Sequence, residues 1–125
     1  MPLRIRTMSN DSQGFYQLLG PLMGSRSVEK EVGIRMYDDA DKEWYTAWMD
    51  EVFVGVASVR GCVVSDCYVK HGQRNKGCMT AILQSIVSNH PGHLKATCTS
   101  MSRDIFAAFG FKQVSATKNF YKMER

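Results

Sequence analysis

Apolar residues recur at two spacings along the chain, and each spacing predicts one kind of element. A period of two indicates a half-exposed strand, whereas apolar residues at i, i+3, i+4 and i+7 indicate an amphipathic helix. Residues 3–7 alternate with a period of two and predict a first strand. Residues 9–11, Ser-Asn-Asp, offer capping side chains for a helix that would bury Phe15, Leu18, Leu19 and Leu22. Because Gly20-Pro21 and Gly24 interrupt that helix, we expect irregular geometry or two short helices through about residue 36.

The middle of the chain carries the clearest pattern. Residues 44–49 and 52–59 are rich in aromatic and β-branched residues on either side of Asp50-Glu51, which predicts an antiparallel hairpin. A further strand is expected over residues 62–69. A helix packed on a sheet follows, because apolar residues take helical spacing at Met79, Ile82, Leu83, Ile86 and Val87.

Four shorter elements complete the pattern. The run Asn89-His90-Pro91-Gly92 ends the helix, and residues 94–98 predict the next strand. A short helix over residues 102–109 and two closing strands, 111–114 and 120–123, come after it. The chain has 125 residues, of which 44% are hydrophobic and 22% charged, and this matches one globular domain. We therefore expect a single α/β domain spanning residues 1–125.

The cysteines and the apolar runs bear on the kind of protein. Cys62, Cys67, Cys78 and Cys98 include no CxxC pair, so we expect reduced, buried thiols and no metal site. No segment approaches the ~20 apolar residues of a membrane span, and residues 1–8 lack an export signal. We expect a soluble, cytoplasmic protein.

The charge balance is mildly positive. Sixteen Lys and Arg residues against twelve Asp and Glu residues give a net charge of +4, with an isoelectric point near 9.0. An ordinary surface with a small positive bias accounts for this balance. An anionic partner, either coenzyme A or a nucleic acid, would also suit it.

The turn between the strand at 62–69 and the long helix has the character of an anion site. A glycine-bearing turn that enters a helix presents backbone N–H groups, backed by the positive end of the helix dipole. The segment Gln73-Arg74-Asn75-Lys76-Gly77-Cys78 supplies such a turn, with two added cations. A GxxxxGK[ST] run and a GxGxxG run are both absent, which excludes the two best-known nucleotide loops.

The run from Val64 to Leu83 resembles the coenzyme A-binding segment of the GNAT superfamily, the GCN5-related N-acetyltransferases. The matching features are Tyr68-Val69 at the strand end, Arg74 and Gly77 in the turn, and the apolar helix. Residues 104–111, Asp-Ile-Phe-Ala-Ala-Phe-Gly-Phe, are similar to the family's closing helix and Gly-Phe turn. The order of elements also agrees over about residues 44–123. The resemblance implies a mixed, mostly antiparallel twisted sheet flanked by helices.

The resemblance also implies an activity: direct transfer of an acyl group, usually acetyl, from acetyl-CoA to an amine in a ternary complex. It implies that Cys67, Tyr68 and Val69 line the pantetheine arm. By the same likeness, the pyrophosphate would be bound by Gln73, Arg74, Asn75, Lys76, Gly77, Cys78 and Met79. Four residues depart from the family pattern: His71 replaces a proline, Asn75 a glycine, Met79 a glycine or alanine, and Phe106 the tyrosine that protonates the leaving thiolate. We expect Met79 to crowd a phosphate or to shift the turn.

Acyl transfer needs a general base for the amine and a general acid for the thiolate. Asp66 is the leading candidate base, because it lies three residues before Val69, where several family members carry a carboxylate facing the amine. Tyr121, Ser100 and Tyr68 each carry a hydroxyl that could replace the missing acid. His71 could contact the cofactor. The aromatic residues Trp44, Tyr45 and Trp48 either shape an acceptor pocket or belong to the core.

Two alternatives remain beside an acyltransferase for a small-molecule or peptidyl amine. A nucleic-acid modifying protein on the same scaffold is motivated by Arg60, Lys70, Arg74 and Lys76, which we expect near one region. A non-catalytic module that binds acyl-CoA is motivated by Met79 and Phe106. An exposed edge strand would favour a homodimer.

Overall fold

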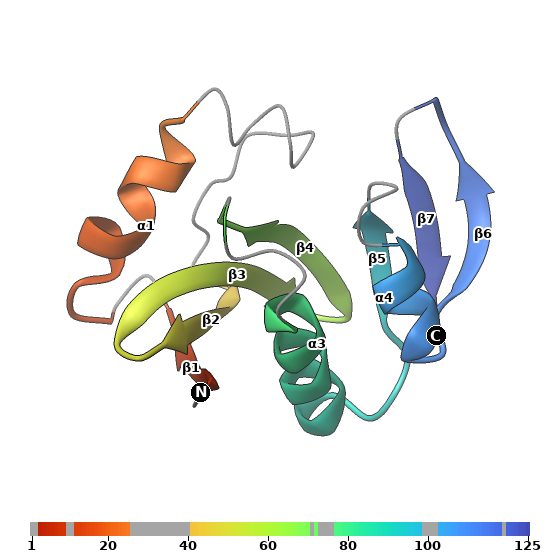
Figure 1. Ribbon diagram of the computed structural model, residues 1–125. Coiled ribbons are helices and arrows are strands. Elements are labelled where there is room, and N and C mark those ends of the chain that lie inside the picture. The colour runs from red at the N-terminus through yellow and green to blue at the C-terminus, as the bar shows by residue number, and fades with distance from the viewer. Residues whose placement is uncertain are drawn as a thin grey trace.

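The computed structural model describes residues 3–9, 12–25, 41–70, 72, 77–98, 103–118 and 120–125. Within these ranges one sheet of seven strands has the order β1-β2-β3-β4-β5-β7-β6 (Figure 1). The strands are β1 (Leu3–Met8), β2 (Glu43–Met49), β3 (Val52–Arg60), β4 (Val63–Val69), β5 (Lys95–Cys98), β6 (Lys112–Ala116) and β7 (Tyr121–Glu124). The helices are α1 (Phe15–Met23), α3 (Cys78–Asn89) and α4 (Arg103–Ala108).

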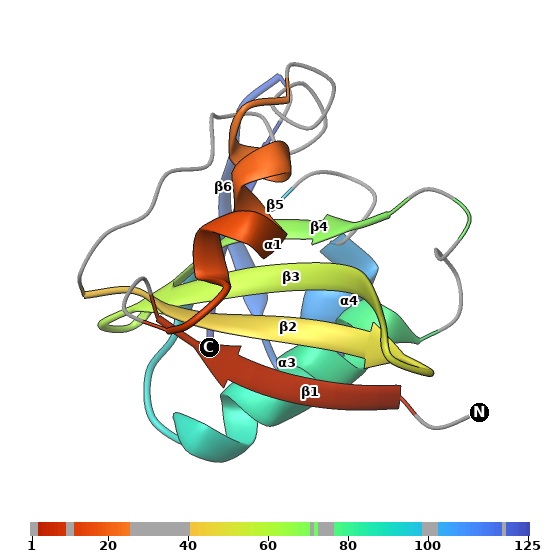
Figure 2. The same cartoon turned by 90° about the vertical axis from the view of Figure 1, so that its left-hand side faces the viewer.

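The sheet is mixed and mostly antiparallel, as predicted. Five of its neighbouring pairs are antiparallel, and β4 with β5 is the parallel pair. Figure 2 shows β1 to β4 as a curved, twisted layer with α1 on one side and α3 on the other. We call these the α1 face and the α3 face.

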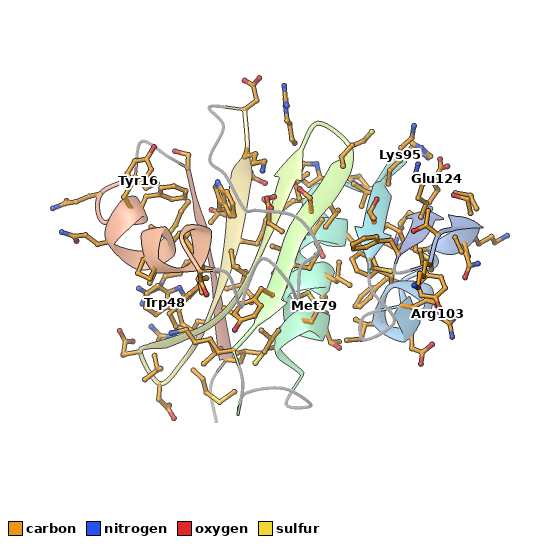
Figure 3. All side chains as sticks on the ribbon, turned by 90° about the horizontal axis from the view of Figure 1, so that it is seen from above. Tyr16, Trp48, Met79, Lys95, Arg103 and Glu124 are labelled. Atoms are coloured by element: carbon orange, nitrogen blue, oxygen red, sulfur yellow. The ribbon has the colours of Figure 1, made fainter. Side chains whose placement is uncertain are left out.

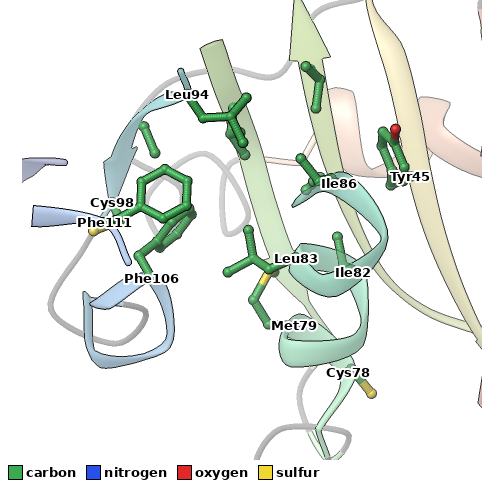
Figure 4. Close-up of a cluster of buried hydrophobic side chains, with 14 of the residues drawn as sticks. Tyr45, Cys78, Met79, Ile82, Leu83, Ile86, Leu94, Cys98, Phe106 and Phe111 are labelled. Carbon is green, nitrogen blue, oxygen red and sulfur yellow. The ribbon is translucent and has the colours of Figure 1, made fainter. Parts of the chain in front are cut away.

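Each face of the sheet has its own buried cluster. On the α1 face Phe15 packs edge-on against Trp44, with ring centroids 5.6 Å apart, together with Leu19, Phe53 and Val56. The α3-face cluster is larger and joins α3 and α4 to the strands (Figure 4). Trp44 and Tyr45 are consecutive residues on β2 and are both fully buried, one in each cluster. Of the three aromatic residues proposed for a pocket, these two therefore belong to the core, and Trp48 is half-buried.

The predicted hairpin forms between β2 and β3. Asp50 and Glu51 at its turn both have positive φ, 50° and 69°. Two such residues characterise the tight turn whose twist matches that of paired strands, so the turn accounts for the register of the hairpin.

The region around α1 differs from the prediction in two respects. The helix is a single element that includes Pro21, and its N-cap is Gly14, with φ 80° and no side-chain cap hydrogen bond. Ser9 does not cap it: its backbone N–H donates to Ser12 Oγ at 2.9 Å in the turn before the helix. Asn10, Asp11 and the region expected to carry a second helix lie outside the described residues.

Candidate functional site

The feature that sets the site apart is the divergence of β4 and β5. These parallel strands pair only at Val63 with Lys95 and at Val64 with Ala96. Beyond these two pairs β4 runs on to Val69 and β5 to Cys98 without pairing with each other, and the strands separate (Figure 1). Backbone groups along the two facing edges are therefore not committed to a shared ladder, and an extended ligand with amide groups could pair with them.

A β-bulge lies in β4 where this divergence begins. Ser58 pairs with Ser65 and Val56 with Tyr68, so Asp66 and Cys67 together oppose one residue of β3. Asp66 has φ 56°, the left-handed region that residues other than glycine rarely adopt. A bulge re-aims side chains, and this one brings the Asp66 carboxylate onto the same face as Ser58 and Ser65.

The Asp66 side chain is fully buried in a small polar cluster on the α1 face. Its Oδ2 atom accepts hydrogen bonds from Lys42 Nζ at 2.8 Å and from Ser58 Oγ at 2.6 Å. The Lys42 side chain is 5% exposed and the Asp66 side chain 0%. Lys42 Nζ also lies 5.3 Å from the centroid of the Trp44 ring. Asp66 Oδ1 has no hydrogen-bond partner in the part of the chain that the structure describes.

Lys42 was not among the residues predicted from the sequence. A lysine that follows a run of aspartates gives no sign of burial, because lysine is ordinarily a surface residue. Its contact with Asp66 joins residues 24 positions apart. Only the fold shows that the predicted base has a buried counter-ion.

Tyr121, a candidate acid, lies on the other face. It is half-buried on β7, where its Cα pairs with that of Cys98, and it packs against the α3-face cluster. The Arg103 guanidinium stacks over its ring, 4.8 Å from the centroid. Figure 3 shows Arg103 on the α4 side of β5 and β7, with Lys95 and Glu124 on the opposite side of these two strands. Asp66 and Tyr121 thus lie on opposite faces of the sheet, near the place where β4 and β5 separate. Ser100, the other candidate acid, lies outside the described residues.

The residues predicted to line the pantetheine arm alternate across β4. Cys67 and Val69 pack against the α3-face cluster, and Tyr68 against the α1-face cluster. Burial, reinforced by the neighbouring Asp66 charge and by Cys98, raises the pKa of the Cys67 thiol well above its usual range. A thiol that stays protonated is a poor nucleophile, which agrees with a structural role for Cys67.

The long helix begins directly after Gly77, which has φ 81°. A Cβ at this position would meet nothing within 4 Å, so the left-handed backbone, and not crowding, requires glycine here. Gly77 provides no side-chain cap, and the first turn of α3 carries no acidic residue. The positive end of the helix dipole is therefore not neutralised from within the described turn. Gln73, Arg74, Asn75, Lys76 and His71 lie outside the described residues.

Two departures from the family pattern prove to be core residues. The Met79 side chain is 7% exposed and packs in the α3-face cluster (Figure 4). Its side chain therefore packs into the core, which differs from the crowding of a phosphate that we expected. Phe106 is fully buried and meets Phe111 edge-on, with ring centroids 5.1 Å apart.

Several expectations about charge and thiols change with the structure. Arg60 pairs with Val63 at the start of β4, whereas Lys70 follows its end, so these two cations lie at opposite ends of one strand and not in one region. The four cysteines are free, but Cys62 is exposed and not buried.

Among the described residues no group of His, Cys, Asp or Glu is arranged to hold a metal ion. Of the helices that the structure describes, none has the length and apolar character needed to cross a membrane.

Comparison with known proteins agrees with this architecture. The family model for the acetyltransferase (GNAT) domain matches residues 23–123. Among solved structures, Escherichia coli ElaA aligns with a TM-score of 0.73 at 16% identity, over 99% of each chain. An acyl-CoA N-acyltransferase from Pseudomonas aeruginosa aligns with a TM-score of 0.69 at 15% identity, again over 99% of each chain.

A third solved structure was determined with a ligand. The Campylobacter jejuni N-acetyltransferase PseH, in complex with acetyl coenzyme A, aligns with a TM-score of 0.63 at 15% identity, over 99% of this chain and 98% of that one. No curated protein matches the sequence. At these identities the structural likenesses show the fold alone, whereas the family model covers most of the chain, and the protein therefore belongs to the GNAT acetyltransferase family.

Proposed function

We propose that the protein is an N-acyltransferase that moves an acyl group, in the first instance acetyl, from acyl-coenzyme A to a primary amine in a ternary complex. The observation that carries this proposal is the parallel pair β4 and β5, which parts after Val64 beside the start of α3. Where two strands separate, their backbone groups can form hydrogen bonds with the amide groups of a pantetheine arm. The N–H groups at the start of a helix can bind a pyrophosphate.

The donor would lie along the diverging edge of β4. The pantetheine arm has amide groups that can pair with the backbone at Cys67, Tyr68 and Val69. The pyrophosphate would meet the backbone of Gly77, Cys78 and Met79 at the positive end of α3, with Gln73, Arg74, Asn75 and Lys76 completing the turn. The structures of PseH with acetyl coenzyme A and of an aminoglycoside acetyltransferase with coenzyme A support acyl-CoA as the donor on this fold.

The acyl transfer then needs three contributions from this chain. Asp66 accepts a proton from the acceptor amine through water, because its side chain is fully buried and cannot contact the amine directly. The oxygen that would receive this proton is Oδ1, which has no partner among the described residues. The amine nitrogen bonds to the thioester carbon and the carbon–sulfur bond breaks. Backbone N–H groups at the bulge polarise the thioester carbonyl, because a bulge interrupts the ladder there. The thiolate takes a proton from Tyr121, or from Ser100, since Phe106 has none to give.

Isothermal titration with acetyl-CoA and with free coenzyme A tests the donor site. The matched variants are Gly77→Glu and Gly61→Glu, because both glycines have positive φ and an added Cβ would meet no atom within 4 Å at either position. We expect saturable binding, weakened at least tenfold by Gly77→Glu alone. Equal binding by the two variants would refute the placement at α3, and a wild type that binds neither ligand would refute acyl-CoA as the donor.

Turnover is a separate question, because a buried Phe106 also suits a module that binds acyl-CoA without catalysis. Free thiol release is measured with acetyl-CoA and a panel of amines, peptides and nucleic acids. We expect release that depends on an amine and on Asp66. Tight donor binding with no acylated acceptor would replace the enzyme with the binding module, and acylation of nucleic acid alone would favour the nucleic-acid modifying alternative.

A further inference from the structure

The part of the sheet formed by β5, β7 and β6 has one covered side and one open side. On the covered side Ala96 and Met123 face each other across β5 and β7 and pack in the α3-face cluster. Neighbouring residues of a strand point to opposite sides, so the residues beside these two point away from α4. Figure 3 shows Lys95 and Glu124 there. We call this the open side, and its paired strand residues are Lys95, Thr97, Lys112, Ser115, Lys122 and Glu124.

The open side is exposed and rich in lysine. Five of its residues are exposed, and Glu124 is half-buried. Glu124 is its one carboxylate, and it already contacts His93 Nε2 at 3.1 Å. Lys95 and Lys112 are opposite Glu124 in the sheet, on β5 and β6. Within the described residues neither of them forms an ion pair, nor does Lys122. This surface is therefore complementary to an anionic partner.

The open side belongs to the same face of the sheet as the Asp66 cluster. Val64 and Ala96 form the last pair of β4 with β5, and both are buried in the α3-face cluster. The next residues, Ser65 and Thr97, therefore both point to the other face, one on each side of the separation. Ser65 Oγ lies 3.4 Å from Asp66 Oδ2 and belongs to the polar cluster around it.

One row of side chains thus leads from the Asp66 cluster onto the open side. Thr97 is opposite Lys122, and Lys122 is opposite Ser115. Paired strands lie about 4.8 Å apart, so the Cα atoms of Ser65 and Lys122 are separated by about 10 Å or more. An extended peptide advances about 3.3 Å per residue. A chain whose amine lies beside the cluster would therefore reach Lys122 with its third residue after the amine, or a later one.

We propose that the acceptor is an acidic peptide, which places its amine beside the Asp66 cluster and a carboxylate on Lys122. The inference rests on the proposed function. Lys95 and Lys112 add positive charge along the same segment, and the two hydroxyls beside Lys122 can donate to its carboxylates. A nucleic acid fits less well, because the strand residues of the open side include no aromatic side chain on which a base could stack.

Peptide pairs that differ at three positions test this preference. Each peptide has one free amine, either the α-amine or a lysine side chain, and carries Glu or Gln at the third to fifth positions after it. The measurement is kcat/KM by thiol release at low and at high salt. At low salt we expect the Glu peptide of a pair to be preferred by at least about tenfold. The difference should shrink at high salt, because exposed charges are screened.

Two charge reversals test the role of Lys122. Lys122→Glu and Arg4→Glu change the net charge equally, and both side chains are exposed. Arg4 lies on β1, at the other end of the sheet, and is the matched control. We expect Lys122→Glu to remove the preference through a higher KM for the Glu peptide, with kcat unchanged, and Arg4→Glu to keep it. Lys122→Gln should reduce the preference to a smaller extent.

The outcomes separate this inference from the proposed function. A wild type that acylates the Glu and Gln peptides equally at low salt, or acylates small amines alone, overturns the inference and leaves the proposed function intact. An equal loss of preference in Lys122→Glu and Arg4→Glu also overturns it, because the effect would then follow net charge. A single-stranded oligonucleotide that inhibits at lower concentration than an acetylated Glu peptide would replace the peptide with a nucleic acid. A wild type that binds acetyl-CoA but acylates no amine overturns the proposed function itself, and the inference with it.

Discussion

A Cβ built on Gly55 would lie 3.2 Å from the carbonyl oxygen of Tyr68 and 3.3 Å from Val69 Cγ2, so a side chain here would force the end of β4 to shift by a few tenths of an ångström. The Ile82 side chain of α3 would be 3.6 Å away. Gly55 thus joins the α3 face to the part of β4 where we place the donor.

Gly55→Ala should destabilise the protein by about 1–3 kcal/mol, because an added methyl group overpacks this junction. The measurement is the free energy of unfolding in urea. Gly20→Ala is the matched control: it lies in α1 with nothing within 4 Å, so the same substitution there should be neutral or stabilising by up to about 1 kcal/mol. Equal effects at the two positions would contradict the close approach.

Alkaline pH should weaken the fold through Tyr45. Burial, followed by its hydrogen bond with Glu43, raises the pKa of Tyr45 from 10.0 to about 12. Between these values the folded chain keeps a proton that the unfolded chain has lost, so the free energy of unfolding falls as pH rises from 10 to 12. Urea midpoints between pH 8 and pH 12 measure this dependence. Tyr45→Phe should be less sensitive to pH in that range, and an identical decline in both proteins would refute the assignment.

Local patterns predicted the elements that local chemistry determines. The hairpin of β2 and β3 follows from β-branched runs around a two-residue turn, and α3 from apolar residues at helical spacing. Met79 is instructive, because its place in that apolar pattern already indicated the core, where the structure has it. The resemblance to the family instead drew attention to the size of Met79 at a position near a phosphate. In the structure this large side chain packs into the core.

The site was less predictable because it depends on the tertiary structure. A left-handed Asp66 has no signal in the sequence, since glycine usually takes that conformation. The contact of Asp66 with Lys42 arises only when β4 and the start of β2 are brought together by the sheet. The sequence therefore indicated which residue type could act as a base, but not the buried lysine that pairs with it.

Thiol reactivity should separate the cysteines. Cys62 is exposed, whereas Cys78 and Cys98 are buried and the pKa of Cys67 is raised by its surroundings. With an aromatic disulfide reagent at pH 7.5 we expect one fast thiol, which Cys62→Ser removes, and much slower reaction of the others. The measurement is the absorbance of the released thiolate over time. Loss of the fast phase in Cys67→Ser instead would show that β4 exposes a reactive thiolate.

Tyr121→Phe should lower kcat by about 100-fold or more while leaving the affinity for acetyl-CoA unchanged, because it removes only the hydroxyl that would protonate the thiolate. The ring under Arg103 is kept, so the free energy of unfolding should change little. Titration, unfolding and turnover at saturating acetyl-CoA separate these effects. Tyr16→Phe, on the exposed side of α1, is the control for loss of a hydroxyl elsewhere. An unchanged kcat in Tyr121→Phe would transfer the role of acid to Ser100 or Tyr68, because Phe106 has no proton to give and occupies the core.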